Sequence, residues 1–143
     1  MLGCTNIDNS STSSNKDSNA IIFDDSFNFS SNQWFYDADV DTLFKVKSDG
    51  VKTWEEAIED LNRRFCQKIK IDLIAKNNDT IFLKIDSAQY LTQQIGSTGA
   101  YGYMAVVTYT LTDYTGIEFV NFDFEEGDHA SPGTYDRKEL KRR

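Results

Sequence analysis

TWEEAIEDLNRRFCQKIKIDLIAKNNDTIFLKI, residues 53–85, is the stretch of sequence that decides the fold. It opens with Thr53 and Glu56 in a T-x-x-E capping box, in which each side chain can bond the other residue's backbone N–H. Apolar residues then recur every three or four positions, which is the period of one helical face. These residues are Trp54, Ile58, Leu61 and Phe65. We therefore predict a helix that begins after Thr53 and buries this face.

The second half of the same stretch changes from a helical period to an alternating one. Residues 67–75 alternate apolar and polar side chains, as a half-buried strand does. A turn signal, Asn77-Asn78-Asp79, follows, and residues 80–85 resume the alternation. The apolar face holds Ile69, Ile71 and Leu73 in the first run and Ile81, Leu83 and Ile85 in the second. The two runs predict a β-hairpin.

Downstream, a second helix and a last strand are expected. Residues 100–112 place Met104, Val107 and Leu111 on one helical face, although the β-branched run VVTYT leaves a strand as the alternative. Residues 117–124, IEFVNFDF, predict a strand. Its buried face holds Val120, Phe122 and Phe124.

Upstream, residues 21–29 and 34–46 both have strand-like content, and we predict that they form a hairpin or an edge pair. The order is then strand, helix, strand, strand, helix, strand. One amphipathic sheet face and two amphipathic helices predict a two-layer α+β sandwich. We place this single domain at residues 21–143.

The front of the chain has a different composition. Residues 5–20 are mostly Asn, Ser, Thr and Asp, and such a run cannot bury enough apolar surface to offset its ordering entropy. It is therefore predicted to be a tether. Just before it, Leu2-Gly3-Cys4 matches the end of a bacterial lipoprotein signal, whose cysteine carries a diacylglycerol. We predict a lipoprotein-like N-terminus and tether at residues 1–20, lipidation at Cys4, and an extracytoplasmic, membrane-anchored protein. A free cysteine in a leader is the alternative.

The composition argues against several classes of protein. The formal net charge is −8, whereas general nucleic-acid binding needs a cationic face. The two cysteines, Cys4 and Cys66, cannot build a disulfide framework or a thiolate metal site. Cys66 is expected to be a small apolar core or boundary residue. We predict no cofactor and no nucleic-acid partner.

Residues 80–120 carry a family resemblance. They contain the strand TIFLKIDSAQYL, then Gly96-Ser97-Thr98-Gly99-Ala100, then Thr110-Leu111-Thr112, and finally Gly116-Ile117-Glu118-Phe119-Val120. In this order the pieces resemble the GerMN domain, named from sporulation and spore-germination proteins. The resemblance implies a compact fold akin to the ring-building modules of secretion systems, residence outside the cytoplasm, often in lipoproteins, and no established catalytic set.

The one histidine, His129, lies in the acidic run Glu125-Glu126-Gly127-Asp128-His129. A histidine beside carboxylates can hold a divalent ion or act as a base, but no second histidine or ligand spacing accompanies it. A Ser-His-Asp site with Ser131 would lack a nucleophile elbow. A solvated acidic loop is the simpler interpretation. We predict neither a metal site nor catalysis.

The loop from Glu125 to Arg137 has no evident role in the core, and we predict that it faces a partner. Its candidate residues are Glu125, Glu126, Asp128, His129, Tyr135 and Arg137. The function that fits best is a non-catalytic, lipid-anchored domain that associates with itself or with an envelope protein, in sporulation or germination. A solute- or glycan-binding lipoprotein, with ligands stacked on rings such as Trp34, Tyr90 and Tyr101, is the alternative. A small hydrolase that uses the acidic loop is the third hypothesis.

Overall fold

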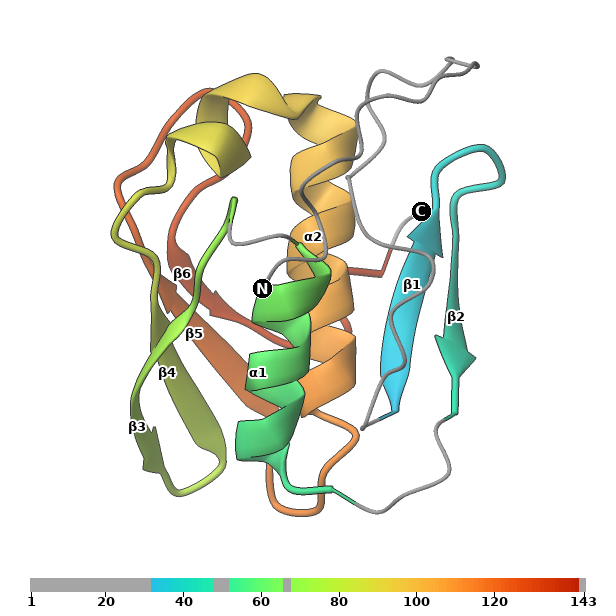
Figure 1. The fold of residues 1–143 in the computed structure, drawn as a ribbon, viewed down its shortest axis with the longest axis vertical. Helices are drawn as coiled ribbons and strands as arrows, with labels where there is room; N and C mark the ends of the chain where they lie inside the picture. The colour runs from blue at the N-terminus through green and yellow to red at the C-terminus, as the bar shows by residue number, and fades with distance from the viewer. Residues whose placement is uncertain (1–31, 48–51, 66–67, 142–143) are drawn as a thin grey trace.

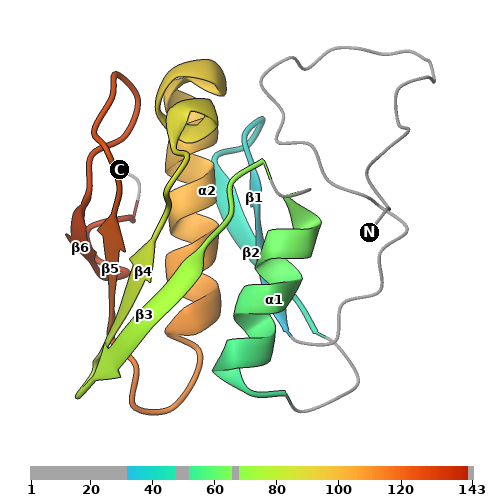
Figure 2. The same cartoon turned by 60° about the vertical axis from the view of Figure 1, so that its left-hand side comes forward.

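A four-stranded sheet, two helices and a separate two-stranded hairpin make up the fold (Figure 1). The computed structural model describes residues 32–47, 52–65 and 68–141. Both helices cover one face of the sheet, and the hairpin lies on the far side of the helices from the sheet (Figures 1 and 2). The predicted α+β sandwich is confirmed, and the hairpin adds a further layer to it. Cys4, Cys66 and residues 21–29 lie outside the described residues.

Helix α1 (Trp54–Arg64) forms as its sequence predicts. The Thr53 hydroxyl accepts from the backbone N–H of Glu56 at 3.2 Å, and the Glu56 carboxylate accepts from the backbone N–H of Thr53 at 3.0 Å. This capping box satisfies N–H groups that the first helical turn leaves without partners. The face with Ile58 and Leu61 is buried, and Trp54 packs against the core.

The sheet has the strand order β3-β4-β5-β6. Its strands are β3 (Asp72–Asn77), β4 (Thr80–Lys84), β5 (Phe119–Asp123) and β6 (Gly133–Tyr135). The two central strands, β4 and β5, run parallel, and the other two pairs are antiparallel. The short strand β6 was not predicted, because it has only three residues and lies inside the segment interpreted as a loop.

A helical crossover joins the two parallel strands. It contains a single π-helical turn (Tyr90–Gln94) and then helix α2 (Gly96–Leu111). Gly96 has φ +80°, a left-handed conformation that side chains rarely adopt, so the chain can turn sharply into α2. The run VVTYT lies within α2, so the helix prediction is confirmed and the strand alternative is wrong. The predicted face with Val107 and Leu111 is fully buried.

One apolar cluster joins both helices to the inner face of the sheet. From the strands it takes Ile81, Leu83, Val120 and Phe122, and from the helices it takes Ala57, Ile58, Leu61, Ala100, Tyr103, Met104, Val107 and Leu111. Burying apolar side chains of this kind contributes about 1.5–3 kcal/mol for each large residue, so the cluster is the main source of stability. No described helix is both long and apolar enough to cross a bilayer.

The prediction for residues 67–75 was wrong in part. Ile69 and Ile71 are buried, but they precede the strand, which begins at Asp72. Leu73 was expected on the buried face and is 40% exposed, and Ile74 is 58% exposed. Leu73 keeps its register opposite the buried Leu83, but β3 is an edge strand and, among the described residues, has a neighbouring strand on one side alone. Ile74 lies in a β-bulge between Leu73 and Ala75, in a strand that extends to the rim of the sheet (Figure 2).

The N-terminal hairpin also differs from the prediction. Both of its strands, β1 (Gln33–Asp37) and β2 (Thr42–Val46), come from the single segment that was expected to supply one strand. Asp41 has φ +52° in the connecting turn, a conformation that Asp tolerates better than most residues. The run DADVD was therefore a turn, and the predicted partner at residues 21–29 lies outside the described residues.

Candidate functional site

Aromatic pairs attach the hairpin to helix α2. Trp34 meets Tyr109 edge to face at 5.0 Å between ring centroids, and Tyr36 meets Tyr101 in the same way at 5.2 Å. Gly102 lies beneath the Tyr36 ring, and a Cβ at this glycine would lie only 2.7 Å from the ring atom Cδ2. Since real Cβ contacts are never so short, glycine is what allows β1 to approach the helix so closely.

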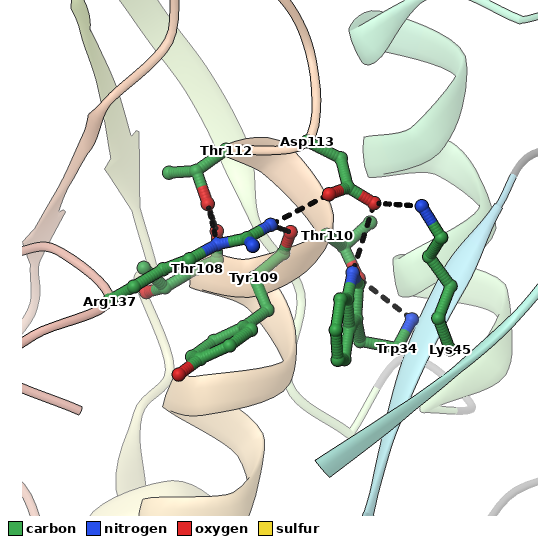
Figure 3. A network of polar contacts seen from close by, with 8 residues as sticks. All are labelled: Trp34, Lys45, Thr108, Tyr109, Thr110, Thr112, Asp113 and Arg137. Atoms are coloured by element: carbon green, nitrogen blue, oxygen red, sulfur yellow. Dashed lines mark hydrogen bonds and ion pairs between the residues drawn. The ribbon is translucent and has the colours of Figure 1, made fainter. Parts of the chain in front are cut away.

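A carboxylate at the end of α2 joins the hairpin to the C-terminal segment (Figure 3). Asp113 accepts three hydrogen bonds, from Trp34 Nε1 at 3.0 Å, from Lys45 Nζ at 2.9 Å and from Arg137 Nη2 at 2.7 Å. The three donors come from β1, β2 and the residues after β6. We call these four residues the Asp113 clasp.

The charge of Asp113 is favoured by its surroundings. Partial burial raises the pKa of the carboxyl, but the hydrogen bonds from Lys45, Arg137 and Trp34 more than offset this, and the pKa lies below its ordinary value. Charge-assisted hydrogen bonds of this kind are shorter and stronger than neutral ones. The clasp therefore holds the hairpin most firmly when Asp113 is ionised.

Arg137 packs against the aromatic rings of this contact with its side chain partly exposed. Its guanidinium lies 4.6 Å from the ring centroid of Tyr109 and 5.3 Å from that of Trp34. It also donates to the Thr112 hydroxyl at 2.8 Å and to the Tyr109 carbonyl at 2.7 Å. The residue predicted to face a partner thus bonds the end of α2, where a cation also complements the helix dipole.

A second cation, Arg64 at the end of α1, holds the opposite face of the hairpin. It is buried, with its guanidinium 3.7 Å from the ring centroid of Phe35. It donates to the Trp34 carbonyl at 2.7 Å and to Gln33 Oε1 at 3.2 Å. Burial lowers the pKa of Arg64 to about 9, which leaves the side chain charged at neutral pH. Both helices therefore fix the position of the hairpin.

The hairpin held in this way exposes apolar side chains on its outer strand. Val40 in the turn is 64% exposed, and Phe44 and Val46 on β2 are 46% and 41% exposed. Phe44 stacks on Phe35 of β1, with 5.6 Å between ring centroids. We call Val40, Phe44 and Val46 the β2 surface. Exposed apolar side chains gathered on one edge strand are typical of a contact surface.

The structure separates the six predicted residues of the C-terminal loop. Glu125, Glu126 and Asp128 are exposed, and Glu126 accepts from the Ser131 hydroxyl at 2.9 Å. Tyr135 lies on β6 instead, half-buried, with its ring centroid 6.0 Å from that of Phe122. With Arg137 in the clasp, the exposed residues among the six candidates are the three acidic ones.

His129 lies beside Ser97, a residue that the sequence did not associate with it. The Ser97 hydroxyl is 3.1 Å from His129 Nδ1, and the backbone N–H of His129 donates to the Thr92 carbonyl at 2.9 Å. Neither partner is a carboxylate, which a serine–histidine pair needs to orient the imidazole for catalysis. Among the described residues, no group of three or more His, Cys, Asp and Glu side chains could hold a metal ion.

The rings proposed for ligand stacking are used in packing. Trp34 and Tyr101 contact partners across the hairpin–helix contact, and Tyr103 is fully buried against Phe65. Tyr90 lies partly buried beneath Lys68 Nζ, 5.2 Å from its ring centroid. These contacts weaken the solute- or glycan-binding alternative, because a stacking site needs a free ring face.

Sequence reasoning missed the residues that fix the hairpin, namely Gly102, Arg64 and Asp113. The sequence of α2 did contain a signal, because its small and apolar residues are not confined to one helical face. In the structure its buried residues accordingly lie on all sides. A helix that is apolar all round is covered all round, so a further layer beyond the sheet was required.

Comparison with known proteins gives one informative result. No family model matches the chain, and no curated protein matches it. Among solved structures, it is similar to the tandem GerMN domains of the sporulation protein GerM from Bacillus subtilis, with 12% identity and a TM-score of 0.53. The match covers 76% of this chain and 46% of that one, so this chain spans about half of the GerM structure. The chain therefore has a GerMN-like fold.

Proposed function

We propose that this domain is a non-catalytic association module, which binds another protein of the cell envelope or a second copy of itself through the β2 surface. The observation that carries the proposal is the exposure of Val40, Phe44 and Val46 on a hairpin that α1 and α2 both hold in place. A rigid strand with exposed apolar side chains loses little entropy on binding, which favours association.

The GerMN-like fold supports a more specific role. Because the similar structure belongs to a sporulation protein, we propose that the association takes place in envelope assembly during sporulation or germination. The test is deletion of the gene in its native host, followed by measurement of spore yield and germination. Unchanged spore formation and germination would contradict the role in sporulation or germination. They would not contradict the proposal that the domain is an association module.

We also propose that the module is tethered outside the cytoplasm by a lipid on Cys4. The proposal is supported by the Leu2-Gly3-Cys4 box and by the polar residues that follow it. Growth with an alkyne-labelled fatty acid should label the protein, and Cys4→Ser should abolish the label. Equal labelling of the Cys4→Ser variant would contradict lipidation at this residue.

Association through the β2 surface can be tested by photocrosslinking in the native host. A photoreactive phenylalanine analogue at Val40 should give covalent protein adducts, because this side chain lies on the proposed contact. Ile74 on β3 is the matched control, since it is apolar and similarly exposed, at 58% against 64%. Adducts of equal yield from both positions, or none from Val40, would contradict the proposal.

A further inference from the structure

The occupant of the β2 surface can be identified from the side chains on β2. Resting on the proposed function, we infer that β2 pairs antiparallel with β2 of a second copy of this chain, with Phe44 opposite Phe44 at the two-fold axis. The two hairpins then form one four-stranded antiparallel sheet. In this register Thr42 lies opposite Val46 of the second copy, and Leu43 lies opposite Lys45.

Strand β2 lies at an edge of its sheet. Within the described residues β2 pairs with β1 alone, and Thr42, Phe44, Lys45 and Val46 are exposed. An unpaired edge carries N–H and C=O groups that can bond a further strand. A second β2 strand supplies these partners.

Charge is distributed unevenly along the hairpin. Acidic residues gather at its turn end, and basic residues gather at the other end of β2. They are Asp37, Asp39 and Asp41 at the turn, and Lys45 and Lys47 at the other end. Antiparallel pairing about Phe44 brings Asp41 of one copy opposite Lys47 of the other, twice by symmetry. Parallel pairing would instead place like charges together.

Two stacked aromatic rings lie on one face of the hairpin. Alternation along the strand puts Trp34 and Tyr36 toward α2, so Phe35 and its cross-strand partner Phe44 face the other way. Pairing about Phe44 extends the stacked Phe35–Phe44 pair into a continuous row of four rings across the dimer. Cross-strand aromatic pairs of this kind stabilise sheets.

Strand β3, an edge of the four-stranded sheet, lacks these features. Its bulge between Leu73 and Ala75 breaks the regular alternation that strand pairing requires, and bulges protect natural sheet edges from such pairing.

The register can be tested by cysteine crosslinking of the purified chain in a Cys4→Ser, Cys66→Ala background. Directly opposed residues in antiparallel strands have Cα atoms about 4.5–5.5 Å apart, a separation that a disulfide can span. Phe44→Cys should therefore form a disulfide-linked dimer with oxidised glutathione. Thr42→Cys alone should not, because its two copies would be about 13 Å apart. A mixture of Thr42→Cys and Val46→Cys chains should crosslink to each other.

Leu73→Cys on β3 is the matched control for random collision, and circular dichroism verifies that each variant folds. If Phe44→Cys disturbs folding, the mixed Thr42→Cys and Val46→Cys pair tests the same register independently. Equal crosslinking at Thr42, Phe44 and Leu73, or none in the mixture, would overturn the inference. Sedimentation of the cysteine-free chain gives a second measurement, in which Phe44→Lys should weaken dimerisation by about tenfold or more and Leu73→Lys should not.

This inference and the proposed function fail in different experiments. Photocrosslinks from Val40 to a different envelope protein, together with no self-crosslink at Phe44, would overturn the dimer and support the association module. No protein adduct from Val40 in the native host would contradict the association module itself.

Discussion

The two sides of helix α2 are packed by different chemistry. Toward the sheet, Val107 and Leu111 join an apolar cluster with residues of β4 and β5. Toward the hairpin, the contact consists of aromatic edges, a glycine and the hydrogen bonds of the Asp113 clasp. Apolar burial depends little on pH and salt, whereas bonds to a partly exposed carboxylate depend on both. The sheet side therefore determines the fold, and the hairpin side positions the proposed contact strand.

The largest effect is expected on the sheet side of α2. Leu111→Ala should lower the free energy of unfolding by about 3 kcal/mol, because it removes buried methyl groups and leaves a cavity. Urea denaturation measures the change. Leu73→Ala, at a position 40% exposed on β3, is the matched control and should cost far less. Equal losses at the two positions would show that Leu111 is not part of the main core.

A smaller loss is expected where the hairpin meets α2 most closely. Gly102→Val should cost about 2 kcal/mol, because the new side chain overlaps the Tyr36 ring and pushes β1 away. The Trp34 indole N–H signal in an NMR spectrum should shift, since its bond to Asp113 depends on the position of β1. Thr98→Val is the control, because it introduces a valine at an exposed position of the same helix. An unshifted Trp34 signal in Gly102→Val would contradict this packing.

The sequence could predict the elements whose signals lie within a few consecutive residues. Local signals were sufficient for α1, because its capping box and its spacing are confined to a few consecutive residues. The alternation in β4 and β5 was sufficient for the same reason.

The attachment of the hairpin was not predictable in this way. Arg64 bonds residues 30 and 31 positions away, and Asp113 bonds Trp34 across 79 positions. No short pattern encodes such pairs. The loop from Glu125 to Arg137 was predicted to face a partner because it had no evident role in the core. Tyr135 and Arg137 were therefore included among its candidate residues, although both pack against the domain.

The clasp should give the hairpin side a dependence on pH. Asp113→Asn should cost about 1 kcal/mol at neutral pH, a modest value because the carboxylate is partly exposed to solvent. The folded pKa of Asp113 is depressed, so its stabilisation is present above the pKa of the unfolded chain and is lost as the pH falls through the folded value. The difference in unfolding free energy between the two proteins should therefore shrink in acid. A difference that stays constant from pH 7 to pH 3 would contradict the assigned charge.

The smallest effect concerns a polar atom on the sheet side. The Tyr103 hydroxyl is buried and, among the described residues, has no hydrogen-bond partner. Burial also raises the pKa of this phenol well above its ordinary value, so it stays neutral. Tyr103→Phe removes a group that lost its bonds to water on folding and gained none from the part of the chain that the structure describes. The free energy of unfolding should therefore stay within about 0.5 kcal/mol of its original value, or rise.

Tyr101→Phe on the same helix is the matched control, because the Tyr101 hydroxyl donates to the Leu140 carbonyl. Its removal leaves that carbonyl without this donor, and the loss should be about 1 kcal/mol. The same chemical change would thus have opposite consequences on the two helix faces. If Tyr103→Phe cost as much as Tyr101→Phe, the Tyr103 hydroxyl would have a hydrogen-bond partner. A polar interaction would then contribute to stability on the sheet side of α2.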